Sequence, residues 1–225
     1  MRSLRTLIIL VALLILVSSN IAAAEALLDA AKAIDWTVQN INSLNQVFAN
    51  KQAVNSFVVQ LYGEEIVVPT VGDYALVDLN NNGTIQLVTT LDFSGRGFFT
   101  TVYVVKKAGN QFQTSELWAP PVSIEDLKSR IVDLHKDGRK EILVPRALAP
   151  YAGATPIPIV SDVHEWDGEK LVKVNAKYKD YYANKVLPRL QKELTKAGQD
   201  QTHQGTQLRE KYSKEIEEVY NILKQ

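Results

Sequence analysis

The spacing of hydrophobic residues predicts a helix in the N-terminal part of the chain. Between residues 25 and 50 the apolar positions recur three and four residues apart, which is the period of one helix face. These positions are Leu27, Ala31, Ile34, Val38, Ile41, Leu44 and Phe48. The same stretch holds Asn40, Asn42, Asn45 and Asn50, and asparagine is a weak helix former that works against a long uninterrupted helix.

The pattern changes to short strands from Ser56 onward. Phe57–Tyr62 and Ile66–Val68 flank Gly63, so they are predicted to form a hairpin. Eight further apolar runs follow, separated by turn residues: Tyr74–Leu79, Ile85–Leu91, Phe98–Val105, Gln111–Leu117, Ile131–Leu134, Glu141–Val144, Pro158–Glu165 and Lys170–Val174. Strands and helices do not alternate, so a parallel doubly wound sheet is not expected. The short strands instead favour a meander, a sandwich or a propeller-like sheet.

Helical spacing returns after Asn175. Tyr182, Val186, Leu190 and Leu194 mark one helix face, Pro188 either kinks or begins this helix, and Gly198 is its expected C-cap. A polar linker, Asp200–Gly205, leads to a second amphipathic helix with Leu208, Tyr212, Ile216, Val219 and Leu223 on its apolar face. We expect the pair to form a hairpin that packs on the strands, and a helix that docks a partner is the alternative.

The first 24 residues have the three parts of a secretory signal. Arg2 and Arg5 precede an apolar run, Leu7–Val17, and Ala22–Ala24 supplies the small residues of a cleavage site. The run of 11 residues is shorter than the roughly 20 that span a bilayer. We therefore expect a chain cleaved after Ala24 and located in the periplasm or outside the cell, with no integral membrane segment. An uncleaved N-terminal anchor is the alternative.

Charge and cysteine content restrict the classes of function. Loss of Arg2 and Arg5 from 25 basic residues leaves 23 against 25 acidic ones, a net charge of −2. Nucleic acid is not an expected partner, because it demands a basic face. The chain has no cysteine, which excludes cysteine proteases, thiolate zinc sites and stabilising disulfides. Hydrophobic residues make up 46% of the chain, so a packed core must supply the stability.

An internal repeat runs through the strand region. Residues 77–88 resemble residues 132–143 at an offset of 55, and each copy is a strand, a D-x-x-x-[DN]-G loop and another strand. A second similarity lies downstream, where Gly109–Phe112 parallels Gly168–Leu171. The extra length of the second copy falls in the proline- and alanine-rich stretch 147–158, which we interpret as a loop insertion.

These loops resemble the D-x-[DN]-x-D-G-x-x-[DE]-[LIV] signature of FG-GAP and VCBS-type repeats, which occur in integrin-like β-propellers and many secreted bacterial proteins. The segment His164–Val172 is similar to the hairpin that follows in such repeats, and Tyr181-Tyr182 with Leu187–Leu190 is similar to the tail of some members. The resemblance covers about residues 74–190. A closed propeller has 4–8 blades, whereas two repeats are visible here. Either a two-repeat sheet capped by its helices or an assembly of several chains follows.

The resemblance implies calcium ligands at loop positions one, three, five and nine, with a backbone carbonyl at position seven. Carried over, the second loop supplies Asp133, His135, Asp137, Arg139 and Glu141, and the weaker first loop supplies Asp78, Asn80, Asn82, Thr84 and Gln86. Calcium needs six to eight oxygen ligands, so the imidazole nitrogen of His135 is the wrong ligand type. The first loop has a single carboxylate, so it offers little negative charge to the ion. The alternative is a pair of turns held by Asx hydrogen bonds without metal.

The fold expectation is therefore a mainly β protein with helical ends. Residues 25–175 are expected to form a β-rich repeat domain with an N-terminal helix, and residues 176–225 a C-terminal helical segment. The expected strands are short and antiparallel, in two propeller-blade-like repeats.

The expected function is that of an exported, non-catalytic binding or structural module whose partner is a protein or a glycan. The chain has no G-x-S-x-G, H-E-x-x-H or P-loop motif. One alternative is a cell-envelope hydrolase that uses Asp73, Asp78 and Asp133, and it requires these carboxylates to converge in one cleft. Another is a subunit of a homo-oligomeric propeller-like assembly. Trp36, Trp118 and Trp166 could stack sugars, although core packing is the expected use.

Overall fold

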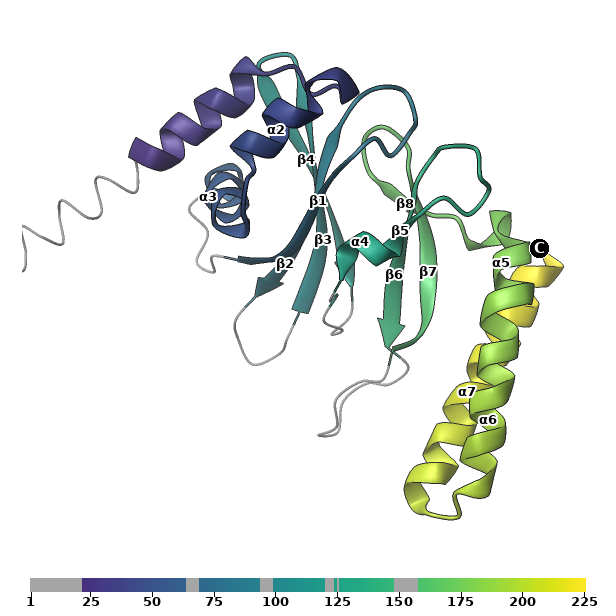
Figure 1. The fold of residues 1–225 in the computed structure, drawn as a ribbon. Helices are drawn as coiled ribbons and strands as arrows, with labels where there is room; N and C mark the ends of the chain where they lie inside the picture. Colours follow the sequence, from purple (N-terminus) through teal and green to yellow (C-terminus); the bar gives the residue numbers. More distant parts are fainter. Residues whose placement is uncertain (1–21, 64–68, 94–98, 120–123, 125, 148–157) are drawn as a thin grey trace, which may run out of the picture.

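The computed structural model describes residues 22–225 except for residues 64–68, 94–98, 120–123, 125 and 148–157 (Figure 1). Its centre is a pair of four-stranded antiparallel sheets, each a meander with its strands in chain order. The first sheet contains β1 (Thr70–Val77), β2 (Gln86–Phe93), β3 (Phe99–Ala108) and β4 (Gln111–Ala119). The second contains β5 (Ile131–Val132), β6 (Glu141–Ala147), β7 (Pro158–Trp166) and β8 (Leu171–Lys173). All eight strands of the predicted repeats are present.

Helices cover both outer faces of the pair of sheets. On the N-terminal side lie a helix over residues 22–33, the 3-10 turn η1 (Val38–Asn40), α2 (Ile41–Val47) and α3 (Lys51–Tyr62). On the C-terminal side lie η2 (Asn175–Lys177), α5 (Lys179–Tyr181), the π-helical turn η3 (Tyr182–Val186), α6 (Leu187–Gln199) and α7 (His203–Lys224). Figure 1 shows the two sheets between these groups. A short helix, α4 (Leu127–Arg130), connects the sheets.

Three hydrophobic clusters hold the layers together, and strand alternation assigns side chains to them. Leu87 and Leu91 of β2 pack against the N-terminal helices, whereas Val88 packs in the cluster between the sheets. This follows because successive side chains of a strand point to opposite faces. The cluster between the sheets joins Val88, Val102 and Val104 to Ile142, Val144 and Trp166. The third cluster joins β7 to Tyr182, Leu190, Val219 and other residues of the C-terminal helices.

The prediction of two repeats of short antiparallel strands with helical ends is confirmed, and the helices explain how two repeats suffice. The protein is mixed α/β, with more helix than strand, and not mainly β as expected. In a propeller each blade packs face to face with its neighbours, so a pair of blades has two outer faces to bury. Here the chain's own helices bury both faces. No helix in the described part of the chain is long and apolar enough to cross a membrane.

The prediction of strand structure over Phe57–Tyr62 is wrong, because these residues belong to helix α3. Asn50 begins the helix as its N-cap: the side chain accepts a hydrogen bond from Ala53 N at 3.0 Å. Val54, Phe57 and Val58 are buried at helical spacing. The run is rich in β-branched and aromatic residues, and burial of this face overrides that local preference. Ile66–Val68 lie outside the described residues.

The single helix predicted over residues 25–50 is also wrong, because the structure divides it. The chain leaves the first helix after residue 33 and passes along the sheet, where Trp36 O accepts a hydrogen bond from Ile85 N at 2.9 Å. Thr37 forms an isolated bridge with Thr84. These contacts attach the segment to the first repeat before η1 and α2 begin.

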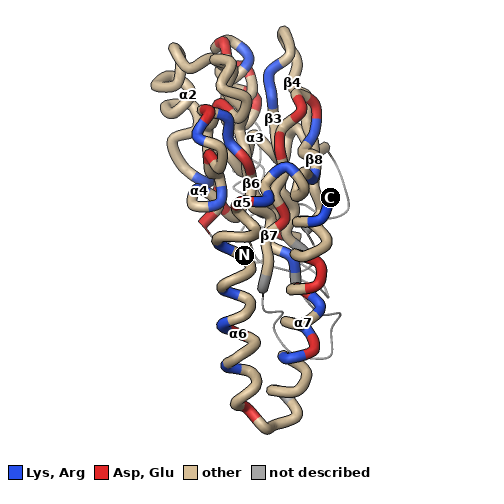
Figure 2. The backbone as a smooth tube through the Cα atoms, turned by 90° about the vertical axis from the view of Figure 1, so that its right-hand side faces the viewer, with Lys and Arg blue, Asp and Glu red and all other residues tan. Residues whose placement is uncertain are grey.

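The C-terminal helices form the predicted hairpin, which packs on the second sheet and extends beyond it (Figure 1). Pro188 is the second residue of α6, and α6 directly follows the π-helical turn η3, so the regular α-helical part begins beside this proline. Gly198 is not the C-cap, since α6 continues to Gln199 and Asp200 caps it. Figure 2 shows acidic and basic residues interspersed along α7.

Candidate functional site

The two predicted loops have the same hydrogen-bond framework. Asp78 accepts hydrogen bonds from Asn82 N at 3.1 Å and Gly83 N at 2.6 Å. Fifty-five residues later, Asp133 accepts from Asp137 N at 3.1 Å and Gly138 N at 3.0 Å. Asn82 Oδ1 then accepts from Thr84 N, and Asp137 Oδ1 from Arg139 N. Both loops are therefore Asx-type turns in which the first carboxylate satisfies two backbone donors.

The ninth position of each loop closes the turn from the following strand. Gln86 Oε1 accepts from Leu79 N at 3.0 Å, and Glu141 Oε2 accepts from Leu134 N at 2.8 Å. Both side chains are buried, each 2% exposed. An amide oxygen and a carboxylate oxygen thus perform the same task in the two copies.

The two loops also contact each other. Asn81 Nδ2 donates to Asp137 O at 3.3 Å, and Lys140 N donates to Leu79 O at 2.8 Å. Gly138 has a φ of 90°, and a Cβ at this position would lie 2.2 Å from Asn81 Nδ2. Glycine is therefore needed here both for the backbone conformation and for the approach of the other repeat.

Around the second loop the structure places further groups that the sequence did not bring together. Tyr178 Oη lies 2.8 Å from Glu141 Oε1 and 2.8 Å from Glu165 Oε1, and His135 stacks on the Tyr178 ring at 4.3 Å. One hydroxyl has one proton, so the two carboxyl groups share it. Burial and these two carboxylates raise the pKa of Tyr178. The loop is thereby tied to the C-terminal segment.

The calcium site that the resemblance implies does not fit this arrangement. Glu141 gives both oxygens to protein donors, the ring of His135 lies on Tyr178, and Lys140 Nζ lies 3.4 Å from Asp133 Oδ2. Desolvation raises the pKa of Asp133, but the Gly138 hydrogen bond and Lys140 outweigh it and lower the pKa. Within the described ranges no three acidic or histidine side chains gather as a metal site. In the first loop Asp78, Asn82 and Gln86 hold backbone donors, Thr84 donates its N–H, and Asn80 Oδ1 is buried with no hydrogen-bond partner.

The carboxylates of the hydrolase alternative lie in strand β1 and in the two loops. Asp73 of β1 accepts from Tyr74 N with Oδ1 and from Leu127 N, at the start of α4, with Oδ2. Asp78 and Asp133 belong to the two loops and accept from backbone donors of their own turns. All three carboxylates therefore accept hydrogen bonds from the backbone, which is the arrangement expected of structural groups.

The tryptophans do not share a surface. Trp36 is buried among the N-terminal helices and Trp166 is buried between the sheets. Trp118 is 55% exposed and stacks on Phe93 with ring centroids 5.3 Å apart. The sugar-stacking arrangement of all three is therefore absent from the described structure.

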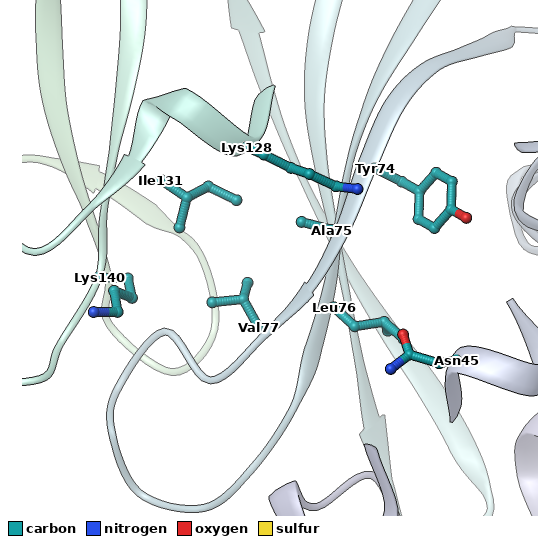
Figure 3. A pocket seen from close by; sticks show the side chains of 8 residues that line it. All are labelled: Asn45, Tyr74, Ala75, Leu76, Val77, Lys128, Ile131 and Lys140. Atoms are coloured by element: carbon teal, nitrogen blue, oxygen red, sulfur yellow. The ribbon is translucent and has the colours of Figure 1, made fainter. Parts of the chain in front are cut away.

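A groove of about 450 Å³ lies beside the first strands of the two repeats (Figure 3). We call it the inner groove, and its lining residues are Asn45, Tyr74, Ala75, Leu76, Val77, Lys128, Ile131 and Lys140. They come from α2, β1, α4, β5 and the second loop. β1 and β5 are edge strands, since each pairs with one neighbour only. Among the described residues that line the groove there are two lysines and no carboxylate.

Lys128 is the groove residue with the most distinctive setting. Its side chain is exposed, and its Nζ lies 5.7 Å from the centre of the Tyr74 ring, a cation–π contact. Figure 3 shows it reaching along β1 toward Tyr74. Sequence analysis missed Lys128, and the signal that could have found it is slight, because α4 is a single turn between the repeats.

A cluster of charged residues lies between the second sheet and α7; we call it the charge cluster. Arg146 of β6 donates to Glu215 Oε2 at 2.8 Å, donates to Glu218, and lies 3.7 Å from Asp162 Oδ1. Lys173 donates to Asp162 Oδ2 at 2.8 Å. Burial raises the pKa of Glu215 to about 7, Arg146 opposes the shift, and Glu218 and Asp162 add to it. These groups join α7 to the sheet.

Comparisons with models of protein families, with curated proteins and with solved structures find no match to this chain.

Proposed function

We propose that this chain is an exported, non-catalytic binding module, periplasmic or secreted, built on two FG-GAP/VCBS-like repeats. Its partner lies in the inner groove. The observation that carries the proposal is the groove itself: it combines two strand edges with apolar and basic side chains, and its described lining residues form no acid–base or nucleophilic constellation.

The repeat framework supports a scaffold role. Each copy forms a four-stranded meander, and the loop hydrogen bonds agree between the copies. The loops contact each other and the sheets share a hydrophobic cluster, so the first strands of the two repeats are held in a fixed relation. A site on rigid strands is well suited to binding, because little order is lost when the partner arrives.

The two alternatives have less support. A hydrolase needs Asp73, Asp78 and Asp133 in one cleft, whereas Asp73 joins β1 to α4 and the other two each hold a loop. A ring of several chains needs free blade faces, and both outer faces are covered by the chain's own helices. A single chain therefore already buries the surfaces through which further blades would pack.

Export is tested with two fusions to alkaline phosphatase, which is active only where its disulfides form. Residues 1–34 in front of the enzyme are expected to give activity, whereas residues 25–34 are expected to give none. N-terminal sequencing of the exported chain should begin at Glu25. Equal activity of the two fusions would remove the export part of the proposal.

Binding in the groove is tested with a photo-crosslinking residue in producing cells. Asn45 lines the groove and is exposed, so Asn45→p-benzoylphenylalanine should yield a defined crosslinked product. Thr195, exposed on α6, is the matched control and should yield none. Identical products at both positions, or none at Asn45, would contradict a partner in the groove.

A further inference from the structure

We propose that the occupant of the inner groove is an extended, acidic peptide segment that adds to the edge of β1 as a further strand. This inference rests on the proposed function, because it names the kind of partner that the groove takes. It follows from the direction of the backbone groups of β1, from the shape of the groove and from its charge.

The hydrogen bonds of β1 show which backbone groups point into the groove. Asp73 N–H donates to Thr90 Oγ1 of β2, whereas Tyr74 N–H donates to Asp73 Oδ1 at 2.8 Å. Tyr74 is opposite Thr89, Ala75 opposite Val88 and Leu76 opposite Leu87 in an uninterrupted antiparallel register. Alternate residues of such a strand direct their backbone groups to the same side, so Leu76 N–H and C=O also point away from β2. They are a donor and an acceptor ready for another strand.

The side chains of β1 form the two borders of the site. Tyr74 and Leu76 pack toward the N-terminal helices, and Val77 packs toward the cluster between the sheets. A strand that bonds to Leu76 would therefore place alternate side chains toward α2 on one border and toward Ile131 on the other. Helix α4 lies against the beginning of β1, where Leu127 N donates to Asp73, so the strand enters from the Leu76–Val77 end.

The positive charge of the groove favours an acidic peptide over a basic one. Lys128 and Lys140 line the groove, and none of the other lining residues that the structure describes is acidic. Lys140 lies 3.4 Å from Asp133, whereas the contact recorded for Lys128 Nζ is the uncharged Tyr74 ring. A glutamate or aspartate of the partner would bring the Lys128 ammonium a counter-charge next to the strand edge. A basic segment would meet repulsion from the same group.

The test uses the chain from Glu25 to Gln225 and labelled peptides of roughly eight residues, a length that spans the groove as a strand. Valine alternates with glutamate in one peptide, and lysine or glutamine replaces every glutamate in the other two. Fluorescence anisotropy should show binding of the acidic peptide, with affinity about tenfold lower for the lysine peptide. Amide exchange at Leu76 should slow when the acidic peptide is bound.

Two charge-reversal variants make the test specific. Lys128→Glu should weaken binding of the acidic peptide about tenfold, whereas Lys192→Glu, which makes the same charge change on the exposed face of α6, should leave it within about twofold. Lys128 is exposed, so the fold should tolerate the change, and an unaltered unfolding midpoint is the check.

Several outcomes would overturn the inference. Equal affinity for the three peptides, or equal loss in both variants, removes the acidic selectivity. Binding without slower exchange at Leu76 removes strand addition. If no peptide binds while Asn45 still yields its crosslink, the binding function stands and its partner is of another kind. If the crosslink is also absent, both proposals fail, and the lysines then serve to keep an edge strand from pairing with a second copy.

Discussion

The outer face of the first sheet is covered by aromatic rings, whereas the outer face of the second sheet is covered partly by ion pairs. Trp36, Phe48, Phe57 and Phe112 form a connected aromatic group with neighbouring centroids 5.0–6.1 Å apart. At the second sheet Tyr182 and Leu190 pack in the hydrophobic cluster, but Arg146 also pairs with Glu215 of α7.

The outer face of a repeat can therefore be covered in two physically different ways, by aromatic rings or partly by ion pairs. Burial of rings stabilises the first half through removal of apolar surface from water, which does not depend on pH. Ion pairs join α7 to the second half at the cost of desolvating charges, so this contact depends on protonation. The helices that cover the first half should therefore be held strongly at any pH, whereas the attachment of α7 to the second half should change in strength with pH.

The largest expected effect is in the aromatic group. Phe57→Ala should lower the free energy of unfolding by about 3–5 kcal/mol, because the ring is fully buried and leaves a cavity. Urea unfolding followed by tryptophan fluorescence measures the change, and the loss should be the same at mildly acidic and neutral pH. A loss that varied with pH would break the contrast between the two halves.

A slightly smaller effect is expected in the charge cluster. Arg146→Ala should cost about 3 kcal/mol, since it leaves Glu215 and Asp162 near each other without their shared cation. Urea unfolding quantifies the cost, and amide exchange should show α7 opening before the first sheet does. Lys211→Ala on the same helix is the control and should change stability by less than about 0.5 kcal/mol.

The stability of the second half should also change with pH. The folded-state pKa of Glu215, about 7, lies above its ordinary value of 4.5. Its contribution to stability is therefore present below about pH 4.5 and is lost as the pH rises through 7. From about pH 5 to pH 8 the wild type should lose on the order of 2 kcal/mol more than Glu215→Gln.

The contribution of His164 to stability has the opposite pH dependence. Burial lowers the pKa of His164 below 6.5, so its contribution is present above pH 6.5 and is lost as the pH falls. The difference between the wild type and Glu215→Gln cancels this contribution because both chains retain His164. If the free energy of unfolding of the two chains changes with pH in parallel, Glu215 carries a charge throughout this pH range.

The two loops offer a finer version of the same comparison. Glu141→Gln should cost less than about 1 kcal/mol, because Gln86 already performs the ninth-position task in the first loop. The reverse change, Gln86→Glu, should cost about 1–2 kcal/mol at neutral pH, because it buries a charge without the hydroxyl that Tyr178 supplies to Glu141. Thermal unfolding of both variants decides, and equal costs would refute the role given to Tyr178.

The smallest expected effect is that of calcium. The loop side chains already hold backbone donors, so calorimetric titration up to about 1 mM calcium should give no binding heat. The matched variant is Asp133→Ala/Asp137→Ala. Heat that appears with the natural chain and vanishes in this variant would show that the second loop rearranges around an ion.

Much of the β region could be predicted from the sequence because its signals are local. Alternating apolar residues and Asp-x-x-x-Asn-Gly turns mark strand and loop within about ten residues. The offset of 55 between Asp78 and Asp133 correctly indicated two copies with the same turn. Helix α3 was missed because Phe57, Val58 and Val59 prefer strands locally, and only burial against the first sheet decides otherwise.

The candidate site could not be predicted, since its members come from three distant stretches of the chain: residue 45, residues 74–77 and residues 128–140. The inner groove unites Asn45 with Tyr74, Lys128 and Lys140, and no spacing in the chain links them. The charge cluster is similar, because Arg146 and Glu215 lie 69 residues apart. The calcium expectation stays a prediction: the carboxylates of the second loop are present, and in this structure both oxygens of Glu141 accept hydrogen bonds from protein donors.

Local period and turn chemistry predict the eight strands of the two sheets, the two similar loops and the amphipathic C-terminal helices, because these signals act over a few residues. Tertiary contacts decide that helices cover both outer faces of the sheets, that β1 is an edge strand, and that the second loop contacts Tyr178. Burial, strand pairing and charge compensation depend on which residues far apart in the sequence come into contact, and the local spacing of residues does not determine those contacts.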